Sequence, residues 1–180
     1  MEDKILEKLP GVQKNVLLKD YTTYKIGGPA KYFFIARTKE DLIMAVESAE
    51  NLRLPIFILG GGSNLLISDK GFNGLVIKIN ISEIKFQENK AVVGAGADMT
   101  ELAYLAAANG LSGLEWSAGI PGTVGGAIYG SAQAFGTKIS DAVETVEAIN
   151  IRELKGHPAV KNFSKKQCRF SLKNSVFKKN

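Results

Sequence analysis

Two glycine-rich segments constrain the fold of this chain more than any other feature of its sequence. The chain holds 19 glycines among 180 residues, and most of them lie between Gly60 and Gly136. Glycine has no Cβ atom and adopts positive φ angles readily, so this cluster predicts tight turns and backbone that another group approaches closely. A loop that cradles a ligand is one interpretation, and a set of packed turns is the other.

The first segment is GGGSNLL, which follows an apolar strand predicted over Ile56–Leu59. Consecutive backbone N–H groups without Cβ atoms suit a diphosphate, and Ser63 and Asn64 add side-chain donors. The spacing matches neither the dinucleotide-binding GxGxxG pattern nor the P-loop, which needs GK[ST]. A simple tight turn explains the same residues, so this loop alone does not decide between the two interpretations.

The second segment is GIPGTVGGAI, at residues 119–128. Pro121 fixes one backbone angle, while four glycines leave the neighbouring backbone bare. The segment has too many glycines for a regular strand and predicts a long, rigid, irregular loop that suits a large flat ligand. A packed core loop is the alternative.

Hydrophobic periodicity predicts the regular elements around these loops. In sequence order they are a short helix at 3–8, a strand after Gly27 and Gly28, a helix within 39–54, strands within 56–59, 71–79 and 90–97, a helix within 99–115 closed by Gly110 or Gly113, and a strand within 141–154. The strand–helix–strand order before Gly60 predicts a parallel pair joined by a crossover helix. Leu102, Leu105 and Ala108 predict the buried face of the later helix.

The charge of the chain is unevenly distributed. The net charge is +5, and residues 151–180 hold nine Lys or Arg against one acid. A solvated basic surface is the plain interpretation, and nucleic-acid binding is the alternative from a different functional class. Because no RNA-binding signature accompanies the charge, we expect no nucleic-acid partner.

Single residues exclude several classes of site. Cys168 is the only cysteine, so the chain has neither an internal disulfide nor a zinc site of several thiolates, and we expect a structural role for it. His157 precedes a proline in a turn context and is expected to be a loop residue rather than a metal ligand. With no signal peptide or apolar span in the sequence, we predict a soluble cytoplasmic protein without a membrane partner.

Four motifs occur together in one order along the chain. They are TTYKIGGPA at 22–30, LGGGSNLLI followed by Asp69 and GFNGLVI at 59–77, VGAGA at 93–97, and GLSGLEWSAGIPGTVGGAI at 110–128. In this order they resemble the flavin-binding portion of the UDP-N-acetylenolpyruvoylglucosamine reductase family, and the resemblance runs from about Asn15 to the C-terminus.

This resemblance implies an α+β fold, namely a two-lobed FAD-binding domain of the vanillyl-alcohol-oxidase type. The lobes are expected at 1–75, with a parallel strand–helix–strand unit, and at 76–180, with a mixed or antiparallel sheet and the glycine-rich flavin loop. The implied activity is reduction of a UDP-sugar, UDP-N-acetylenolpyruvoylglucosamine, to UDP-N-acetylmuramate, with FAD and NADPH as cofactors. This step belongs to peptidoglycan precursor synthesis.

The resemblance also assigns the cofactor-binding residues, and it implies no metal. The first loop is expected along the FAD pyrophosphate through Gly60, Gly61, Gly62, Ser63, Asn64 and Leu65. The second is expected beside the ribityl chain and isoalloxazine through Gly119, Ile120, Pro121, Gly122, Thr123, Gly125, Gly126 and Ala127.

Three departures from the family bear on activity. In CRFSLKNSVFKK, Leu172 and Lys173 replace the family's tyrosine and catalytic arginine, and lysine keeps the charge but loses the planar fork that binds a carboxylate. Gln133 replaces a glycine and is expected to strain the loop, because a positive φ is costly for glutamine. The chain stops at Asn180, before the family's substrate domain. Three interpretations stay open: the gene is truncated, a separate chain supplies the missing domain, or the chain is an excised fragment. A non-catalytic flavin-binding module is the alternative function.

Overall fold

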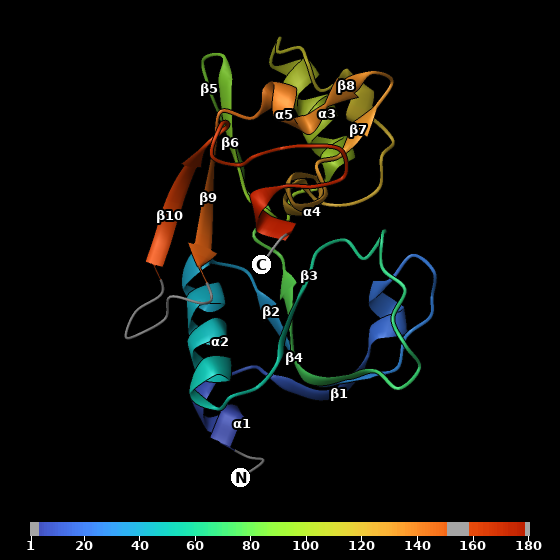
Figure 1. Cartoon of the computed structure of the whole chain (residues 1–180), viewed down its shortest axis with the longest axis vertical. Helices are drawn as coiled ribbons and strands as arrows, with labels where there is room; N and C mark the ends of the chain where they lie inside the picture. Colours follow the sequence, from blue (N-terminus) through green and yellow to red (C-terminus); the bar gives the residue numbers. More distant parts are fainter. Residues whose placement is uncertain (1–3, 151–158, 179–180) are drawn as a thin grey trace. The chain divides into compact units, whose positions relative to one another are not determined.

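The computed structural model describes residues 4–150 and 159–178, which form two compact units (Figure 1). The first unit runs to Ile81, and the second begins at Ser82. The boundary predicted after residue 75 falls inside strand β4, Phe72–Ile79, all of which belongs to the first unit. His157 and the end of the strand predicted within 141–154 lie outside the described residues.

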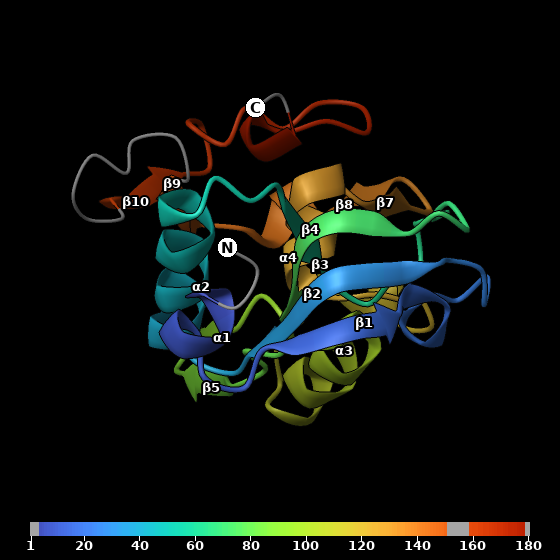
Figure 2. The same ribbon diagram turned by 90° about the horizontal axis from the view of Figure 1, so that it is seen from below.

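A four-stranded sheet forms the centre of the first unit, in the order β1–β2–β4–β3. Its other strands are β1 (Gln13–Leu17), β2 (Pro29–Ala36) and β3 (Ile56–Leu59). Strand β1 is antiparallel to β2, whereas β2 and β3 both run parallel to β4 (Figure 2). As predicted, β2 and β3 run parallel to each other with a helix between them in sequence, but they are not adjacent, because β4 returns after the glycine loop and inserts between them.

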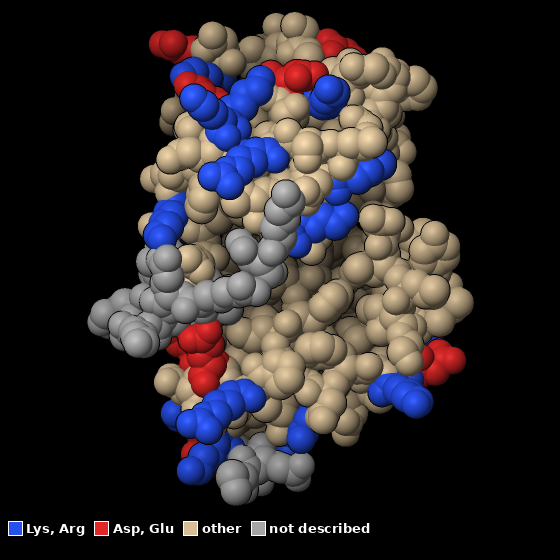
Figure 3. All heavy atoms as spheres, viewed as in Figure 1, with Lys and Arg blue, Asp and Glu red and all other residues tan. Residues whose placement is uncertain are grey.

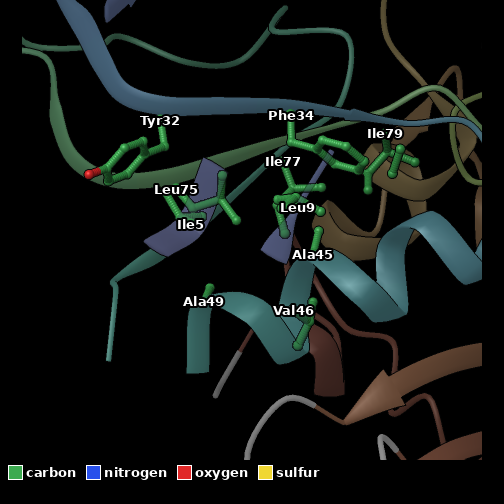
Figure 4. Packing of buried hydrophobic residues seen from close by; sticks show 11 residues of the cluster. Ile5, Leu9, Tyr32, Phe34, Ala45, Val46, Ala49, Leu75, Ile77 and Ile79 are labelled. Carbon is green, nitrogen blue, oxygen red and sulfur yellow. The ribbon is translucent and has the colours of Figure 1, made fainter. Parts of the chain in front are cut away.

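Helices α1 (Lys4–Lys8) and α2 (Lys39–Asn51) pack on one face of this sheet (Figure 4). Helix α2 begins with a capping box: Thr38 Oγ1 accepts the Asp41 N–H at 3.0 Å, and the Asp41 carboxylate accepts the Thr38 N–H at 3.1 Å. Such reciprocal caps satisfy two of the N–H groups that a helix start leaves unpaired. The buried side chains of this layer are Ile5, Leu9, Tyr32, Phe34, Ala36, Ala45, Val46, Ala49, Leu75, Ile77 and Ile79.

The opposite face of the sheet is covered by loops. A 3₁₀ turn, η1 (Leu18–Tyr21), packs there together with side chains that follow the first glycine segment. Leu65 and Ile67 contact the buried Phe33, Leu59 and Val76 cluster. The glycine loop is thus tied to the sheet at its beginning, through β3, and at its end, through Leu65.

The second unit combines short helices with three antiparallel strand pairs. Its elements are β5 (Ile84–Gln87), β6 (Lys90–Val93), α3 (Met99–Ala108), η2 (Glu115–Ser117), α4 (Val124–Gly130), β7 (Gln133–Ala134), β8 (Thr137–Lys138), α5 (Ile139–Ala142), β9 (Thr145–Asn150), β10 (Ala159–Ser164) and η4 (Val176–Lys178). Its core holds Ala97, Met99, Leu102, Trp116, Val124, Ala127 and Ile139. Strand β10 was not predicted, because its polar residues hide the alternation.

Helix α3 confirms one sequence prediction, its closure by Gly110, and corrects another. It ends at Ala108, and Gly110 follows with φ +73°, a left-handed conformation typical of helix C-termini. Its buried residues are Met99, Leu102, Ala103 and Ala106, whereas Leu105 is exposed. The prediction that Leu105 and Ala108 share the buried face is wrong, because Ala108 is exposed as well.

The basic residues of the C-terminal segment lie on the surface. Lys165, Lys166 and Arg169 are all exposed, and Figure 3 shows Lys and Arg side chains interspersed with uncharged surface. Among the described residues, no helix is long and apolar enough to cross a membrane. The same residues contain no group of three or more His, Cys, Asp or Glu that could hold a metal ion.

Candidate functional site

The first glycine loop leaves the sheet at the carboxyl end of β3. Gly62 is buried and has φ +72°, and a Cβ atom at this position would clash with the Tyr21 carbonyl oxygen. The Gly62 carbonyl also accepts a hydrogen bond from the Thr23 N–H at 3.2 Å. Gly62 is therefore glycine for a structural reason, since both its φ angle and its close approach to the 21–23 segment exclude a side chain.

The residues on either side of Gly62 are more open. Gly61 and Asn64 are exposed, and Ser63 is half-buried. Gly61 does not have a positive φ, so nothing in its backbone angle requires glycine. The first loop therefore presents bare backbone beside the polar side chains of Ser63 and Asn64. This is the arrangement that its sequence predicts for binding a diphosphate.

Lys78, near the end of β4, supports the start of this loop. Its Nζ donates a hydrogen bond to the Gly60 carbonyl oxygen at 2.7 Å. Burial lowers the pKa of the Lys78 ammonium from its ordinary value of 10.5, because an apolar environment disfavours the charged form. We did not predict a role for Lys78, although a lysine inside the apolar run LVIKI was the available signal.

The second glycine segment is helical over much of its length, which sequence reasoning did not predict. Helix α4 begins after Thr123, whose Oγ1 accepts the Gly126 N–H at 3.4 Å. The backbone of residues 119–123 stays irregular, with positive φ at Gly119 and Gly122. Threonine is a favoured helix N-cap, so the TVGG sequence itself begins the helix.

The VGAGA segment holds the second loop by backbone hydrogen bonds. Val124 N–H donates to the Ala97 carbonyl at 2.9 Å, and Gly125 N–H donates to the Ala95 carbonyl at 2.8 Å. A Cβ atom on Gly125 would lie 2.9 Å from Ala95 Cβ and from its carbonyl oxygen. Thr100 completes the support, since its hydroxyl accepts the Gly119 N–H at 3.1 Å.

Other glycines of the second segment face open space. Apart from the adjoining backbone, no atom of residues 4–150 and 159–178 lies within 4 Å of a Cβ built on Gly119, and within the same residues only Thr123 Oγ1 lies near one built on Gly126, at 3.4 Å. The segment therefore divides into glycines that pack against protein and glycines whose backbone stays accessible. Accessible backbone next to a rigid helix start is what a large flat ligand requires, so the residues present fit a flavin.

Trp116 belongs to the core of the second unit. It is 7% exposed and packs with Met99, Leu102 and Val124. Its indole Nε1 has no hydrogen-bond partner in the part of the chain that the structure describes.

The segment that replaces the family's Tyr-Arg pair forms a tight turn. Ser171 and Asn174 exchange two backbone hydrogen bonds, at 2.9 and 3.1 Å, and Lys173 between them has φ +54°. Leu172 and Lys173 are both exposed. Ser175 is buried, and its hydroxyl donates to the Tyr129 carbonyl at 2.9 Å, which fixes the turn to the end of α4.

Backbone with positive φ lies two residues to either side of Gln133 rather than at Gln133. Gln133 lies in β7 and is not among the residues with positive φ, so the expected strain at Gln133 is wrong. The residues with positive φ are instead Ser131, the C-cap of α4, with φ +49°, and Phe135, with φ +51°. At Ser131 the reason is that helix α4 ends there, and a left-handed residue is a common way to end a helix.

Comparison with known proteins identifies the class to which this fold and these loops belong. Residues 30–153 match a family model described as an FAD binding domain, and the chain belongs to that family. At 35% identity and a TM-score of 0.74, it is similar to the crystal structure of UDP-N-acetylenolpyruvylglucosamine reductase from Thermus caldophilus, over 91% of this chain and 56% of that one.

Curated relatives point to the same reductases. UDP-N-acetylenolpyruvoylglucosamine reductase from Lactobacillus delbrueckii subsp. bulgaricus is 36% identical over 94% of this chain and 56% of its own length. The enzyme of the same name from Solibacter usitatus is 37% identical over 93% of this chain and 52% of its own length. These relatives confirm the resemblance seen in the motifs, and the chain spans about half of their length.

A more distant neighbour supports the fold class alone. The Physcomitrella patens protein BBE-like 1 matches 91% of this chain with a TM-score of 0.61 at 18% identity. The predicted fold, a two-lobed FAD-binding domain of the vanillyl-alcohol-oxidase type, is confirmed by these structural neighbours.

Proposed function

We propose that this chain is the FAD-binding part of an enzyme that reduces UDP-N-acetylenolpyruvoylglucosamine to UDP-N-acetylmuramate, with NADPH as the electron donor. The observation that carries the proposal is the pair of supported glycine loops in a chain 36% identical to reductases of that name. A role in peptidoglycan precursor synthesis and a cytoplasmic location are parts of the same proposal.

Each loop has its own part in cofactor binding. Gly60–Leu65 binds the diphosphate of FAD through backbone N–H groups, with Ser63 and Asn64 as additional donors. Ile120–Ala127 lies against the flavin end of the cofactor, where Gly126 leaves the backbone open and the α4 start keeps it rigid. FAD, when bound, supplies hydride transfer, while the protein supplies position and protonation.

Lys173 is the proposed catalytic cation of this chain. Reduction of the enolpyruvyl group leaves negative charge that a nearby cation stabilises until a proton arrives. The exposed Lys173 ammonium, on a turn held by Ser175, supplies a positive point charge. It lacks the two parallel hydrogen bonds that an arginine donates to a carboxylate. We expect this chain to stabilise the charge less well than an arginine-containing relative.

By resemblance to the family, a serine that acts as the acid and a glutamate are the other catalytic groups, and both are expected in the substrate domain, which lies in the half of the relatives that this chain does not span. The proposal therefore includes a further polypeptide region or a separate chain that binds the UDP-sugar and delivers the proton. A non-catalytic flavin-binding module is the second candidate function. The specific observation in its favour is the turn at 171–174, where Leu172 and Lys173 stand in place of the family's tyrosine and arginine.

Anaerobic spectroscopy tests the proposal and separates the two candidates. The chain is loaded with FAD, reduced with NADPH, and then mixed with the enolpyruvyl sugar, with a full-length relative as the positive control. Bleaching by NADPH and return of the oxidised flavin spectrum with the sugar support the reductase. Retained flavin that the sugar does not reoxidise supports the non-catalytic module, and a chain that retains no flavin refutes both.

A further inference from the structure

Lys78 is an unusual residue for its position. It follows Leu75, Val76 and Ile77, which are all fully buried in β4, a central strand of the four-stranded sheet. Lys78 itself is half-buried, and its pKa is lowered by burial. Taking an ammonium group out of water costs free energy unless the group finds a partner, so the partner that Lys78 finds indicates what the residue does.

That partner is the first peptide of the glycine loop. Lys78 lies opposite Leu59 in the parallel pairing of β3 and β4. From this position its Nζ reaches the carbonyl of Gly60, the residue directly after β3, at 2.7 Å. A hydrogen bond with a charged donor is about twice as strong as a neutral one, so Lys78 restrains the peptide at the point where the loop begins.

Restraining this carbonyl also orients an N–H group. In a trans peptide the C=O of one residue and the N–H of the next lie in one plane and point in opposite directions. The Gly60 carbonyl points to Lys78, so the Gly61 N–H points the other way. By the same geometry, the bond from the Thr23 N–H to the Gly62 carbonyl directs the Ser63 N–H away from Thr23.

We propose that Lys78 is a positioning residue for the diphosphate loop, which holds the Gly60–Gly61 peptide so that the Gly61 N–H is presented to an anionic diphosphate. This inference rests on the proposed binding of FAD by the first loop. Lys78 acts through the loop rather than by contact with the cofactor. Thr23 provides the second anchor, and because that anchor is a backbone group, Lys78 is the one that a side-chain substitution can remove.

The test compares three variants of the whole chain by FAD titration and by thermal unfolding without FAD. Lys78→Met removes the donor and suits the apolar strand, Lys78→Arg keeps a charged donor, and Lys70→Met removes one exposed positive charge just before the opposite end of β4. We expect Lys78→Met to weaken FAD affinity about tenfold, which is about 1.4 kcal/mol. Lys78→Arg is expected to recover most of this loss, and Lys70→Met to stay within about twofold of wild type.

Unfolding distinguishes positioning from a general structural role. Removal of a half-buried ammonium offsets the lost hydrogen bond, so the apo midpoint of Lys78→Met is expected not to fall. Unchanged FAD affinity in Lys78→Met overturns the inference, and so does a parallel loss of affinity and apo stability. If the wild-type chain does not bind FAD at all, the proposed function is refuted. That outcome is distinct from the two outcomes that overturn the role of Lys78.

Discussion

The two glycine loops are built on opposite principles. The first is restrained at a few points, by the Lys78 ammonium on Gly60 and by the left-handed backbone of Gly62 next to Tyr21. The second is joined to the 95–100 segment by a series of backbone bonds and continues directly into a capped helix. Both expose bare backbone, but one depends on single residues and the other on a network.

Two loops with similar glycine content can therefore need glycine at their individual positions for different reasons. In each loop, the backbone or its packing requires one glycine, and we expect a neighbouring exposed glycine to be required only if a ligand lies against it. Gly62 and Gly125 belong to the first kind, and Gly61 and Gly126 to the second. Paired alanine substitutions therefore separate folding from ligand binding within each loop.

The largest expected effect is that of Gly62→Ala. Positive φ disfavours alanine, and the added Cβ meets the Tyr21 carbonyl oxygen, so backbone has to move. We expect a loss of unfolding free energy of at least about 3 kcal/mol, measured by urea denaturation. The matched control is Gly61→Ala, which is expected to keep near wild-type stability but to weaken FAD binding. Equal stability losses in the two variants would contradict the division made above.

The second loop is expected to respond more mildly. Gly125→Ala places a Cβ 2.9 Å from Ala95, and the crowding is expected to cost about 1–2 kcal/mol after the gain in helix propensity is included. Its control, Gly126→Ala, adds a methyl group at an exposed helical site and is expected to be neutral or stabilising by about 0.5 kcal/mol. Weaker FAD binding by Gly126→Ala, without lost stability, would sharpen the comparison. Unchanged binding would remove Gly126 from the site.

A smaller effect is expected at the turn that carries Lys173. Ser175→Ala removes the buried hydroxyl that donates to the Tyr129 carbonyl at 2.9 Å, and we expect a cost of about 1 kcal/mol. Ser171→Ala is the control, because Ser171 is exposed and uses only its backbone in the turn. Thermal unfolding measures both, and a Ser175→Ala chain as stable as Ser171→Ala would show that the turn is not anchored through this hydroxyl.

The smallest effect concerns Cys168. Burial raises the pKa of its thiol above the ordinary value of 9.0, so the folded state disfavours the thiolate. Its contribution to stability is therefore present below pH 9.0 and is lost as the pH rises through the folded pKa. Above pH 9.0, we expect the unfolding free energy to fall more steeply with rising pH in wild type than in Cys168→Ala. Identical profiles would contradict a buried thiol at this position.

Local sequence patterns predicted many of the helices and strands but not the order of the strands in the sheet. The bounds of β3 and the position of α2 follow from apolar runs and hydrophobic periodicity, because both signals lie within a short stretch of sequence. The insertion of β4 between β2 and β3 depends on long-range pairing, and no local signal encodes it. The helix in TVGGAIYG was missed because glycine content outweighed the threonine cap.

The candidate site was predictable to a similar degree. The order of the motifs located both loops, because several short patterns in sequence are more specific than any one. Lys78 supports the first loop at Gly60, which is 18 positions away in the sequence, and Thr100 supports the second loop at Gly119, which is 19 positions away. Only a structure shows that these residues are in contact. The roles of Gly60–Leu65 and Ile120–Ala127 in binding FAD stay predictions.

Flavin retention tests the central claim most directly. The purified chain is incubated with FAD, passed through a desalting column, and examined by visible absorbance, with Gly61→Ala as a folded variant expected to bind less. We expect wild-type chain to elute yellow with about one flavin per chain, and Gly61→Ala to elute with less. A folded wild-type chain that elutes colourless would contradict the assignment of both loops to FAD.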